Sequence, residues 1–266
     1  MRGVDVVVHC AGAVRGWRAR FQETNVDGTR RLVRALLRDT AGPVPHVVFV
    51  SSLAAREPHL SPYAASKRAA ERVLEEEFDG VPWTALRPPA VYGPGDREIL
   101  PLFSWMARGL APVLGREDAR FSLLYVDDLV ECLARLAQHA GPTRGVREIH
   151  DGRVGGYDWN DVRAAVARLS GRPVRRVRVP LPLLRLLAAL NLGLRSSFGS
   201  TGSVIRGPLL TPGKVRELYH PDWVCDDSTL RAETGWRPRV SLAEGLRRTL
   251  FPTAPVAVGV PQTPCS

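Results

Sequence analysis

Residues 46–67 read HVVFVSSLAAREPHLSPYAASK, and this stretch decides the fold. Its first five residues form a continuous apolar and mostly β-branched run, which predicts a strand buried on both faces. Ser61 is a candidate N-cap in front of Pro62, and Ala, Leu and Glu residues recur at helical spacing up to Phe78. The sequence therefore predicts a buried strand followed by a helix over 62–78.

The same alternation of strand and helix continues along the first half of the chain. Apolar runs predict further strands at 4–9 (VDVVVH) and 83–87 (WTALR). Apolar residues at helical spacing predict further helices at 21–38, 99–109, 126–139 and 159–169. Crossovers long enough to hold a helix imply parallel strands, so the predicted fold is α/β, a doubly wound parallel sheet. After about residue 152, helices and Pro/Gly-rich connections predict a smaller, mostly helical C-terminal lobe.

The composition is that of an ordinary globular protein. With 44% apolar residues, 24% charged residues and a mean hydropathy of -0.10, the 266-residue chain can bury a core. The net charge is +10, but 35 of the 37 basic residues are arginines spread along the chain, so no nucleic-acid partner is predicted. The four cysteines form no CxxC pair, which predicts neither zinc site nor disulfide framework. Without a signal core or a long apolar stretch, the expected location is cytoplasmic.

Tyr63 and Lys67 carry the clearest chemical signal. They lie four residues apart on the predicted helix, so both side chains project from one face. A nearby ammonium favours the phenolate, which makes the pair a candidate general acid/base. Because Lys67 is one of only two lysines, an accidental Tyr–Lys pair at this spacing has a chance of about 4%. The alternative is such a chance pair on a solvated helix face.

Ser51 and Ser52 directly follow the strand at 46–50. This position is the carboxyl edge of a parallel sheet, where such folds bind their ligands. A serine pair after a strand more often forms a turn or a helix cap, so the pair alone is weak evidence for a catalytic site. The evidence becomes stronger because Tyr63 follows only eleven residues after Ser52. The three residues form one hypothesis for a catalytic group.

Six segments, in this order, resemble the extended short-chain dehydrogenase/reductases. They are VDVVVHCAG (4–12), NVDGT (25–29), FVSS (49–52), YAASK (63–67), LRPPAVYGPGD (86–96) and YVDDLVECL (125–133). The chain is most similar to the branch that holds 3β-hydroxysteroid dehydrogenases and NAD-dependent epimerase/dehydratase-like reductases. The resemblance implies a partial Rossmann-like dinucleotide-binding domain over 1–151. It also implies a substrate lobe over 152–252, with some segments interleaved with the first domain, and a flexible tail over 253–266.

The resemblance also implies roles for individual residues. Tyr63 becomes the acid/base, Lys67 its partner and a ligand of the nicotinamide ribose, and Ser52 the hydroxyl that orients the reacting oxygen. Asn25 matches the catalytic asparagine of the family. The residues implied to line the cofactor, beside Tyr63 and Lys67, are Ala11, Gly12, Ser51, Pro88, Pro89, Ala90 and Val91. The implied cofactor is NAD or NADP, and no metal is expected.

The sequence departs from the family at its start. The family opens with a strand, a GxxGxxG turn and a helix that together bind the pyrophosphate, and no such turn occurs here. Since residues 4–12 correspond to the fourth strand of the family, roughly sixty residues, the length of two βα units, are expected to be missing. A misassigned start is the favoured explanation, and a pseudo-enzyme fragment and a split protein stay open.

These features predict an NAD(P)-dependent oxidoreductase that interconverts a secondary alcohol and a ketone on a small, lipophilic or steroid-like substrate. Phe121 stands where nucleotide-sugar epimerases tend to carry a phosphate-binding arginine, although Arg120 is adjacent. The alternatives are a sugar-nucleotide epimerase or dehydratase with bound NAD, and a non-catalytic truncated scaffold.

Two further features concern partners and metals. The apolar stretch 180–194 is too short to span a bilayer, and it is interpreted as a core or substrate-cap helix or as a peripheral membrane contact. Asp127 and Asp128 lie at the start of a predicted helix, where acidic side chains interact favourably with the helix dipole. This interpretation is preferred to a metal-binding pair of carboxylates. Family relatives also suggest a homodimer through helices 21–38 and 62–78.

Overall fold

Four parallel strands form the central sheet of the computed structural model, which describes residues 3–38, 42–138, 144–196 and 210–252. The strand order is β1-β2-β3-β8, with β1 at Val6–His9, β2 at His46–Val50, β3 at Trp83–Arg87 and β8 at Gly145–Glu148. Each neighbouring pair is parallel. The predicted α/β class and parallel sheet are confirmed, and two of the three predicted strands have the predicted bounds.

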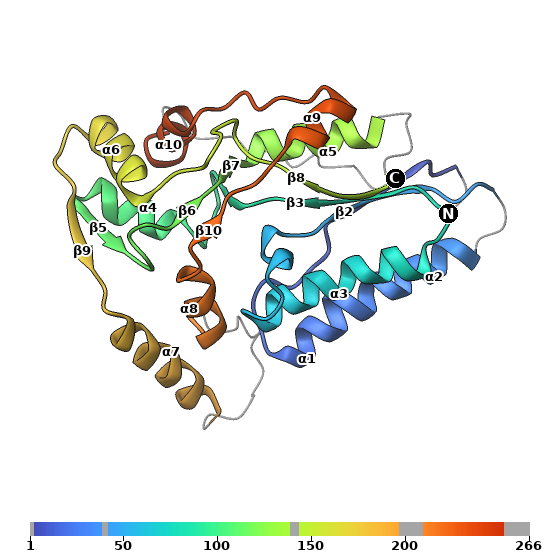
Figure 1. The fold of residues 1–266 in the computed structure, drawn as a ribbon, viewed down its shortest axis with the longest axis horizontal. Coiled ribbons are helices and arrows are strands. Elements are labelled where there is room, and N and C mark those ends of the chain that lie inside the picture. The colour runs from blue at the N-terminus through green and yellow to red at the C-terminus, as the bar shows by residue number, and fades with distance from the viewer. Residues whose placement is uncertain (1–2, 39–41, 139–143, 197–209, 253–266) are drawn as a thin grey trace, which may run out of the picture.

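Helices cover both faces of this sheet (Figure 1). On one face lie α2 (Gly28–Arg38) and α3 (Pro62–Glu77), and on the other lie α5 (Val126–Gln138) and α9 (Ser228–Thr234). Successive residues of β2 divide between two hydrophobic cores, because Val47 and Phe49 pack towards α2 and α3 while Val48 joins the opposite core. This alternation explains why the strand reads as continuously apolar.

The helix predicted over 21–38 is interrupted in the structure. A short α1 (Arg18–Phe21) passes into a π-helical segment, η1 (Gln22–Asp27), before α2 begins. Periodicity cannot distinguish a π turn from an α-helix, because a single wide turn displaces the apolar pattern by only one residue. Asn25 lies inside this π segment and is buried.

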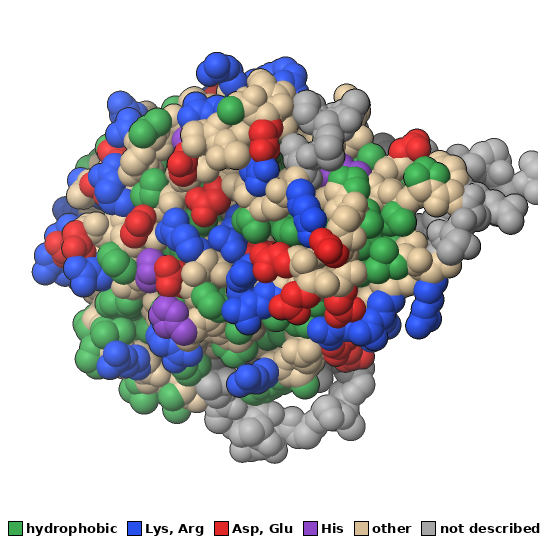
Figure 2. Space-filling model, turned by 45° about the vertical axis from the view of Figure 1, so that its right-hand side comes forward, with side chains coloured by type: hydrophobic (Ala, Val, Ile, Leu, Met, Phe, Trp, Pro, Cys, Tyr) green, Lys and Arg blue, Asp and Glu red, His purple; other side chains and the backbone are tan. Residues whose placement is uncertain are grey.

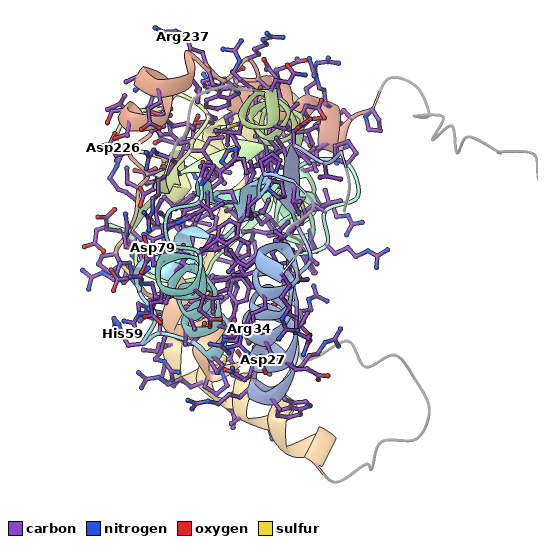
Figure 3. All side chains as sticks on the ribbon, turned by 90° about the vertical axis from the view of Figure 1, so that its right-hand side faces the viewer. Asp27, Arg34, His59, Asp79, Asp226 and Arg237 are labelled. Atoms are coloured by element: carbon purple, nitrogen blue, oxygen red, sulfur yellow. The ribbon has the colours of Figure 1, made fainter. Side chains whose placement is uncertain are left out.

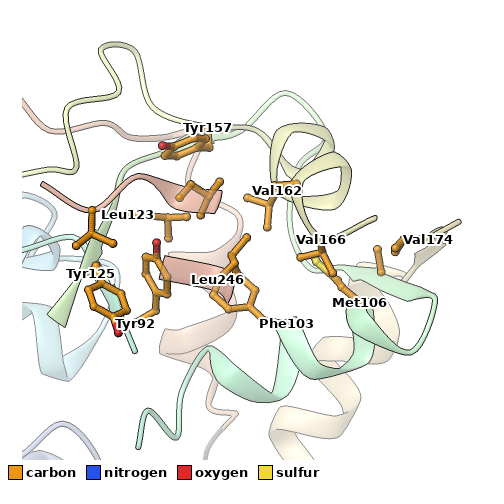
Figure 4. Close-up of a cluster of buried hydrophobic side chains, with 14 residues drawn as sticks. Tyr92, Phe103, Met106, Leu123, Tyr125, Tyr157, Val162, Val166, Val174 and Leu246 are labelled. Carbon is orange, nitrogen blue, oxygen red and sulfur yellow. The ribbon is translucent and has the colours of Figure 1, made fainter. Parts of the chain in front are cut away.

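A third hydrophobic core lies beyond the carboxyl end of the sheet and forms the centre of a second lobe (Figure 4). Its buried residues come both from 92–125 and from 157–246, and include Tyr92, Phe103, Leu123, Val162 and Leu246. Three helices contribute: α4 (Leu100–Ala107), α6 (Trp159–Ser170) and α10 (Leu242–Leu250). Segments distant in sequence therefore share one lobe.

Short strands join this second lobe together. Parallel pairs form between β4 (Ala90–Tyr92) and β7 (Leu123–Tyr125), between β5 (Leu110–Val113) and β9 (Arg175–Arg178), and between β6 (Arg120–Phe121) and β10 (Asp222–Trp223). The sequence predicted mainly helices here. Strands of two to four residues are too short to establish an alternating pattern.

Two helices complete the described chain, α7 (Leu181–Ser196) and α8 (Pro212–Leu218), with a 3-10 turn η2 (Leu53–Arg56) near the sheet edge. The helix predicted over 180–194 is present as α7. Residues 197–209, which follow α7, and the predicted tail 253–266 lie outside the described residues. None of the described helices is long and apolar enough to cross a membrane.

Charged side chains are distributed over the outside of the molecule. Lys and Arg alternate with Asp and Glu in Figure 2, and labelled residues such as Asp79 and Arg237 project from different sides in Figure 3. Many arginines are paired, as Arg30 is with Glu77 and Arg147 with Glu233. This mixed surface differs from the single basic face typical of a nucleic-acid-binding protein.

Candidate active site

The carboxyl ends of β1, β2 and β3 bring together the segments that begin at Cys10, Ser51 and Pro88. Backbone hydrogen bonds connect two of these segments, because Ser51 N donates to Leu86 O at 2.8 Å and Leu53 N donates to Pro88 O at 2.9 Å. Parallel strands make this convergence possible, since all their carboxyl ends meet at one edge.

Helix α3 carries Tyr63 and Lys67 over this edge. It begins as predicted, with the Ser61 side chain accepting a hydrogen bond from Ala64 N at 3.0 Å and with Pro62 in the first turn. Tyr63 is partly buried, and its ring packs edge-on against Phe21 at a centroid distance of 5.9 Å. The Ser52 hydroxyl lies near enough to the Tyr63 phenol to lower its pKa. The structure therefore brings the predicted serine and tyrosine into contact.

Lys67 is buried beside the loop that follows β1. Its Nζ donates to Val50 O at 2.8 Å and lies 5.0 Å from the centre of the Phe49 ring. Burial lowers the pKa of Lys67 to about 8, against the opposing attraction of the negative charge of Glu71. Gly12 passes so close that a Cβ there would lie 3.3 Å from Lys67 Nζ.

The Tyr63 phenol has a different environment from the one expected. Burial raises the pKa of Tyr63 to about 12, with the nearby Ser52 hydroxyl acting in the opposite direction and the negative charges of Glu217 and Glu98 acting in the same direction as burial. The sequence predicted that the Lys67 ammonium would lower this pKa. In the structure that ammonium donates a hydrogen bond to Val50 O. The pKa of Tyr63 is therefore set mainly by burial and by the two carboxylates, which raise it.

Asn25 holds the loop after β1 against α3. Its side-chain amide accepts from Ala13 N at 2.7 Å and donates to Ala13 O at 3.0 Å and to Ser66 Oγ at 2.9 Å. Its polar atoms are thus engaged by the protein itself. This geometry fits a residue that positions Gly12 and α3 better than one that touches substrate.

Ser51 and Ser52 differ in their surroundings. Ser51 is buried, and its Oγ donates to the buried carboxylate of Glu71 at 2.5 Å. Ser52 is half-buried and caps the turn η2 by accepting from Ala54 N at 3.2 Å. The structure therefore turns the Ser51 hydroxyl under α3, away from the role in lining the cofactor that the resemblance implied.

The remaining predicted cofactor residues form a surface of small and apolar side chains at the sheet edge. Ala11, Gly12 and Ala90 are exposed, Pro89 and Val91 are half-buried, and Pro88 is buried. The space left by the missing Cβ of Gly12, between Lys67 Nζ and Asn25 Oδ1, would be filled by any larger residue. These residues fit the nicotinamide end of a dinucleotide.

Two acidic residues that sequence reasoning missed support the site. Glu71 is completely buried, and it accepts hydrogen bonds from Arg87 Nε at 2.8 Å and Nη2 at 2.6 Å in addition to Ser51. Its position four residues after Lys67, on the same helix face, was an available signal. Glu217 lies on α8, more than 150 residues away in sequence, and no sequence signal connects it with Tyr63.

Two other sequence interpretations concern Asp128 and Arg120. Asp128 is buried and accepts from the backbone N–H groups of Arg239 and Val240, both at 3.0 Å. The described residues contain no cluster of His, Cys, Asp and Glu that could hold a metal ion. Arg120 donates to the carbonyls of Gly155 at 2.6 Å and Gly156 at 2.9 Å, so its guanidinium is already engaged.

Comparison with known proteins gives matches along most of the chain. A family model described as the NAD dependent epimerase/dehydratase family matches residues 1–149. A ceramide reductase of Caulobacter vibrioides is 35% identical over 251 residues, which cover 94% of this chain and 74% of that protein. A 2-alkyl-3-oxoalkanoate reductase of Stenotrophomonas maltophilia is 28% identical, covering 92% and 79%. A sterol-4-alpha-carboxylate 3-dehydrogenase of Schizosaccharomyces pombe is 26% identical, covering 92% and 76%.

Solved structures share the fold at lower sequence identity. A UDP-glucuronic acid 4-epimerase from Bacillus cereus, determined with NAD, superposes with a TM-score of 0.68 at 18% identity, covering 94% of this chain and 74% of that one. A UDP-glucose 4-epimerase from Thermotoga maritima gives a TM-score of 0.66 at 22% identity, covering 92% and 76%. These similarities confirm the predicted Rossmann-like fold.

Proposed function

Because the chain belongs to the NAD dependent epimerase/dehydratase family, we propose that it interconverts a secondary alcohol and a ketone on a small lipophilic substrate, with Tyr63 as acid/base. The family is NAD-dependent, and the relatives similar to this chain include proteins named as a reductase and a dehydrogenase. The observation that carries the proposal is the placement of Tyr63 and the buried Lys67 on α3 at the carboxyl edge of the sheet, with the Ser52 hydroxyl near the phenol. This edge is where doubly wound folds bind substrate and dinucleotide.

The residues of the chain supply the proton and the orientation for this reaction. In the reduction, Tyr63 Oη donates its proton to the carbonyl oxygen as that oxygen gains negative charge, and Ser52 Oγ donates a hydrogen bond to the same atom. In the oxidation, the Tyr63 phenolate takes the hydroxyl proton back. The nicotinamide, when bound, supplies the matching hydride exchange. Lys67 would face the ribose, since its Nζ adjoins the space beside Gly12.

A lipophilic substrate is supported by two observations. The relatives include proteins named as reductases of ceramide and of 2-alkyl-3-oxoalkanoates and as a sterol dehydrogenase. In addition, Arg120 is bonded to two backbone carbonyls, and the Phe121 ring packs at a tilted angle against Trp159 with the ring centroids 4.7 Å apart. This region therefore offers aromatic surface where a sugar diphosphate would need a positive charge.

A sugar-nucleotide epimerase or dehydratase is the second candidate. Both reactions use the same serine, tyrosine and lysine, so these residues do not separate it from a dehydrogenase. The solved sugar-nucleotide enzymes support it only through their common fold. Net turnover of the cofactor separates the two reactions, because an epimerase returns its NAD unchanged.

The test is an assay of the full chain with NADH and NADPH against ketones of increasing lipophilicity, namely a short-chain ketone, a 3-ketosteroid and a long-chain keto-lipid. The proposal expects stoichiometric loss of NAD(P)H with the lipophilic ketones. Tyr63→Phe should lower turnover by at least about a hundredfold. Tyr125→Phe, a change in the hydrophobic core of the second lobe, is the matched control.

Other outcomes of this assay contradict the proposal. Conversion of UDP-glucose without net loss of NADH would support the epimerase, and Tyr63→Phe activity equal to wild type would exclude the acid/base role. Failure to bind either dinucleotide in calorimetry would support the non-catalytic scaffold. Homodimerisation through α2 and α3 and a cytoplasmic location are further proposals, which light scattering and cell fractionation test.

A further inference from the structure

Helix α7 presents a stripe of exposed leucines. Leu184 and Ala188 are buried against Val215 of α8, which fixes the inward face of the helix. The outward side carries four leucines that are 44 to 56% exposed, at positions 183, 186, 187 and 190. This spacing of i, i+3, i+4 and i+7 places them on one helix face. Among the described helices, no other exposes more than one large hydrophobic side chain.

Basic residues lie on α7 and on the strand that precedes it. Arg185 is exposed on α7 itself, and β9, which leads into the helix, carries the exposed residues Arg175, Arg176 and Arg178. Glu117 pairs with the last two, and α7 contains no acidic residue. The described residues of this surface therefore have a net positive charge. Hydrophobic side chains gather at the lower left of Figure 2, with single basic side chains among them, on the side where α7 lies in Figure 1.

We propose that α7 docks on the surface of an anionic lipid bilayer. The leucine stripe would enter the boundary between headgroups and acyl chains, while the arginines of α7 and β9 would contact the acidic headgroups. The helix would lie in the plane of the membrane surface, since it is too short to cross the bilayer. A second copy of the chain fits this face poorly, because a symmetric pairing would bring the arginines of both copies together.

The proposed membrane surface is connected with the site through one helix. Val215 of α8 packs against α7, and Glu217 of the same helix accepts a hydrogen bond from Ser61, the N-cap of the helix that carries Tyr63. One short helix therefore connects the proposed membrane surface with the start of α3. The docking itself does not depend on the proposed function.

Vesicle flotation of the full chain tests the docking. We expect binding to phosphatidylcholine vesicles that contain about 30% phosphatidylglycerol, and release as salt increases. The double variant Leu186→Asp/Leu190→Asp should lower the partition coefficient at least about tenfold, since two leucines leave the bilayer. The matched control is Val130→Asp on α5, because Val130 is 58% exposed and Leu186 is 56% exposed. This control should bind like the wild type.

The charge is tested separately. Arg175→Gln/Arg185→Gln should weaken binding to the anionic vesicles and leave the residual binding to pure phosphatidylcholine unchanged. Tyr63→Phe should bind vesicles like the wild type, so a failure of the proposed catalysis remains distinguishable from a failure of the docking. Circular dichroism confirms that each variant is folded.

Three results would overturn the docking. The first is an absence of binding to anionic vesicles. The second is binding that the leucine variant does not weaken. The third is a dimer in light scattering that Leu186→Asp/Leu190→Asp dissociates, since the stripe would then be an interface between copies of the chain.

Discussion

The carboxylate of Glu217 accepts a hydrogen bond from the hydroxyl of Ser61, the residue that caps the helix bearing Tyr63. The same approach brings Gly213 so close that a Cβ there would lie 2.8 Å from Ser61 Cβ. Arg216 Nε also donates to Leu60 O at 2.7 Å. Helix α8 is thereby fixed against the start of α3, and a buried negative charge is placed near the Tyr63 phenol.

Glu217→Gln should shift the pH profile of alcohol oxidation to lower pH. The negative charge of Glu217 raises the pKa of Tyr63, so its removal makes the phenolate easier to form. The kcat/KM for oxidation rises with pH below the pKa of the base, about tenfold per unit. At a fixed pH of about 8 we therefore expect the variant to oxidise the alcohol at least about twofold faster in kcat/KM.

Glu98→Gln is the matched control for this shift. Glu98 also raises the pKa of Tyr63, but its effect is the smaller of the two, and it forms an ion pair with Arg15 at the surface. Its profile should move less than that of Glu217→Gln. An unchanged or alkaline-shifted profile for Glu217→Gln would show that the carboxylate acts only through packing.

Lys67→Met should remove a pH dependence of stability. Burial lowers the pKa of Lys67 to about 8 from 10.5, so between these values the unfolded chain binds a proton that the folded chain lacks. The free energy of unfolding of the wild type should therefore rise with pH through this window. Since one pKa unit corresponds to about 1.4 kcal/mol, the gain from pH 7.5 to 9.5 is about 2 kcal/mol.

Urea denaturation at these two pH values measures the gain. Lys67→Met should lose it, whereas Lys214→Met should keep it, because the Lys214 side chain is 46% exposed. The two residues are the only lysines of the chain, which makes the pair of variants a complete comparison. A gain that persists in Lys67→Met would assign the dependence to other groups.

Local signals were sufficient to predict the elements of the central sheet. The strands at 46–50 and 83–87 were predicted with their observed bounds, and the helix at 62–78 was predicted to within one residue. Each is an uninterrupted run with a clear start or stop residue. The parallel pairs of the second lobe were not predicted, because the partners β4 and β7 are short and far apart in sequence.

The candidate site was predicted where its residues share one element. Helical spacing placed Tyr63 and Lys67 together, and the position of Ser52 after a strand brought it to the same edge. Tertiary contacts determined the rest: the Lys67 ammonium bonds to Val50 O, and Ser51 turns towards Glu71. Sequence spacing carries no information about how deeply Lys67 and Ser51 are buried, and this burial determines their hydrogen-bond partners.

Glu71→Ala should be strongly destabilising. Glu71 is fully buried and compensates Arg87, whose side chain is only 14% exposed, so the variant leaves a buried charge without its partner. Such a loss costs about 3–5 kcal/mol. The control is Glu75→Ala, which breaks the partly exposed pair with Arg68 and should cost less than about 1 kcal/mol. Similar urea midpoints for the two variants would contradict the assigned burial.

Gly12→Ala should impair the site without unfolding the protein. A Cβ at Gly12 would lie 3.3 Å from Lys67 Nζ and 3.4 Å from Asn25 Oδ1, so it would displace the buried ammonium by a few tenths of an ångström. A misplaced catalytic group lowers turnover, and we expect kcat/KM to fall on the order of tenfold.

Gly28→Ala provides the comparison for this last change. Gly28 is helical, and an added Cβ there meets its nearest atom, Glu23 O, at 3.7 Å, an ordinary contact. Alanine also favours a helix over glycine by about 1 kcal/mol, so this variant should keep its activity and unfold at equal or higher urea. If Gly12→Ala retains full kcat/KM as well, the space beside Lys67 is not occupied during turnover, and the placement of the cofactor at this edge is wrong.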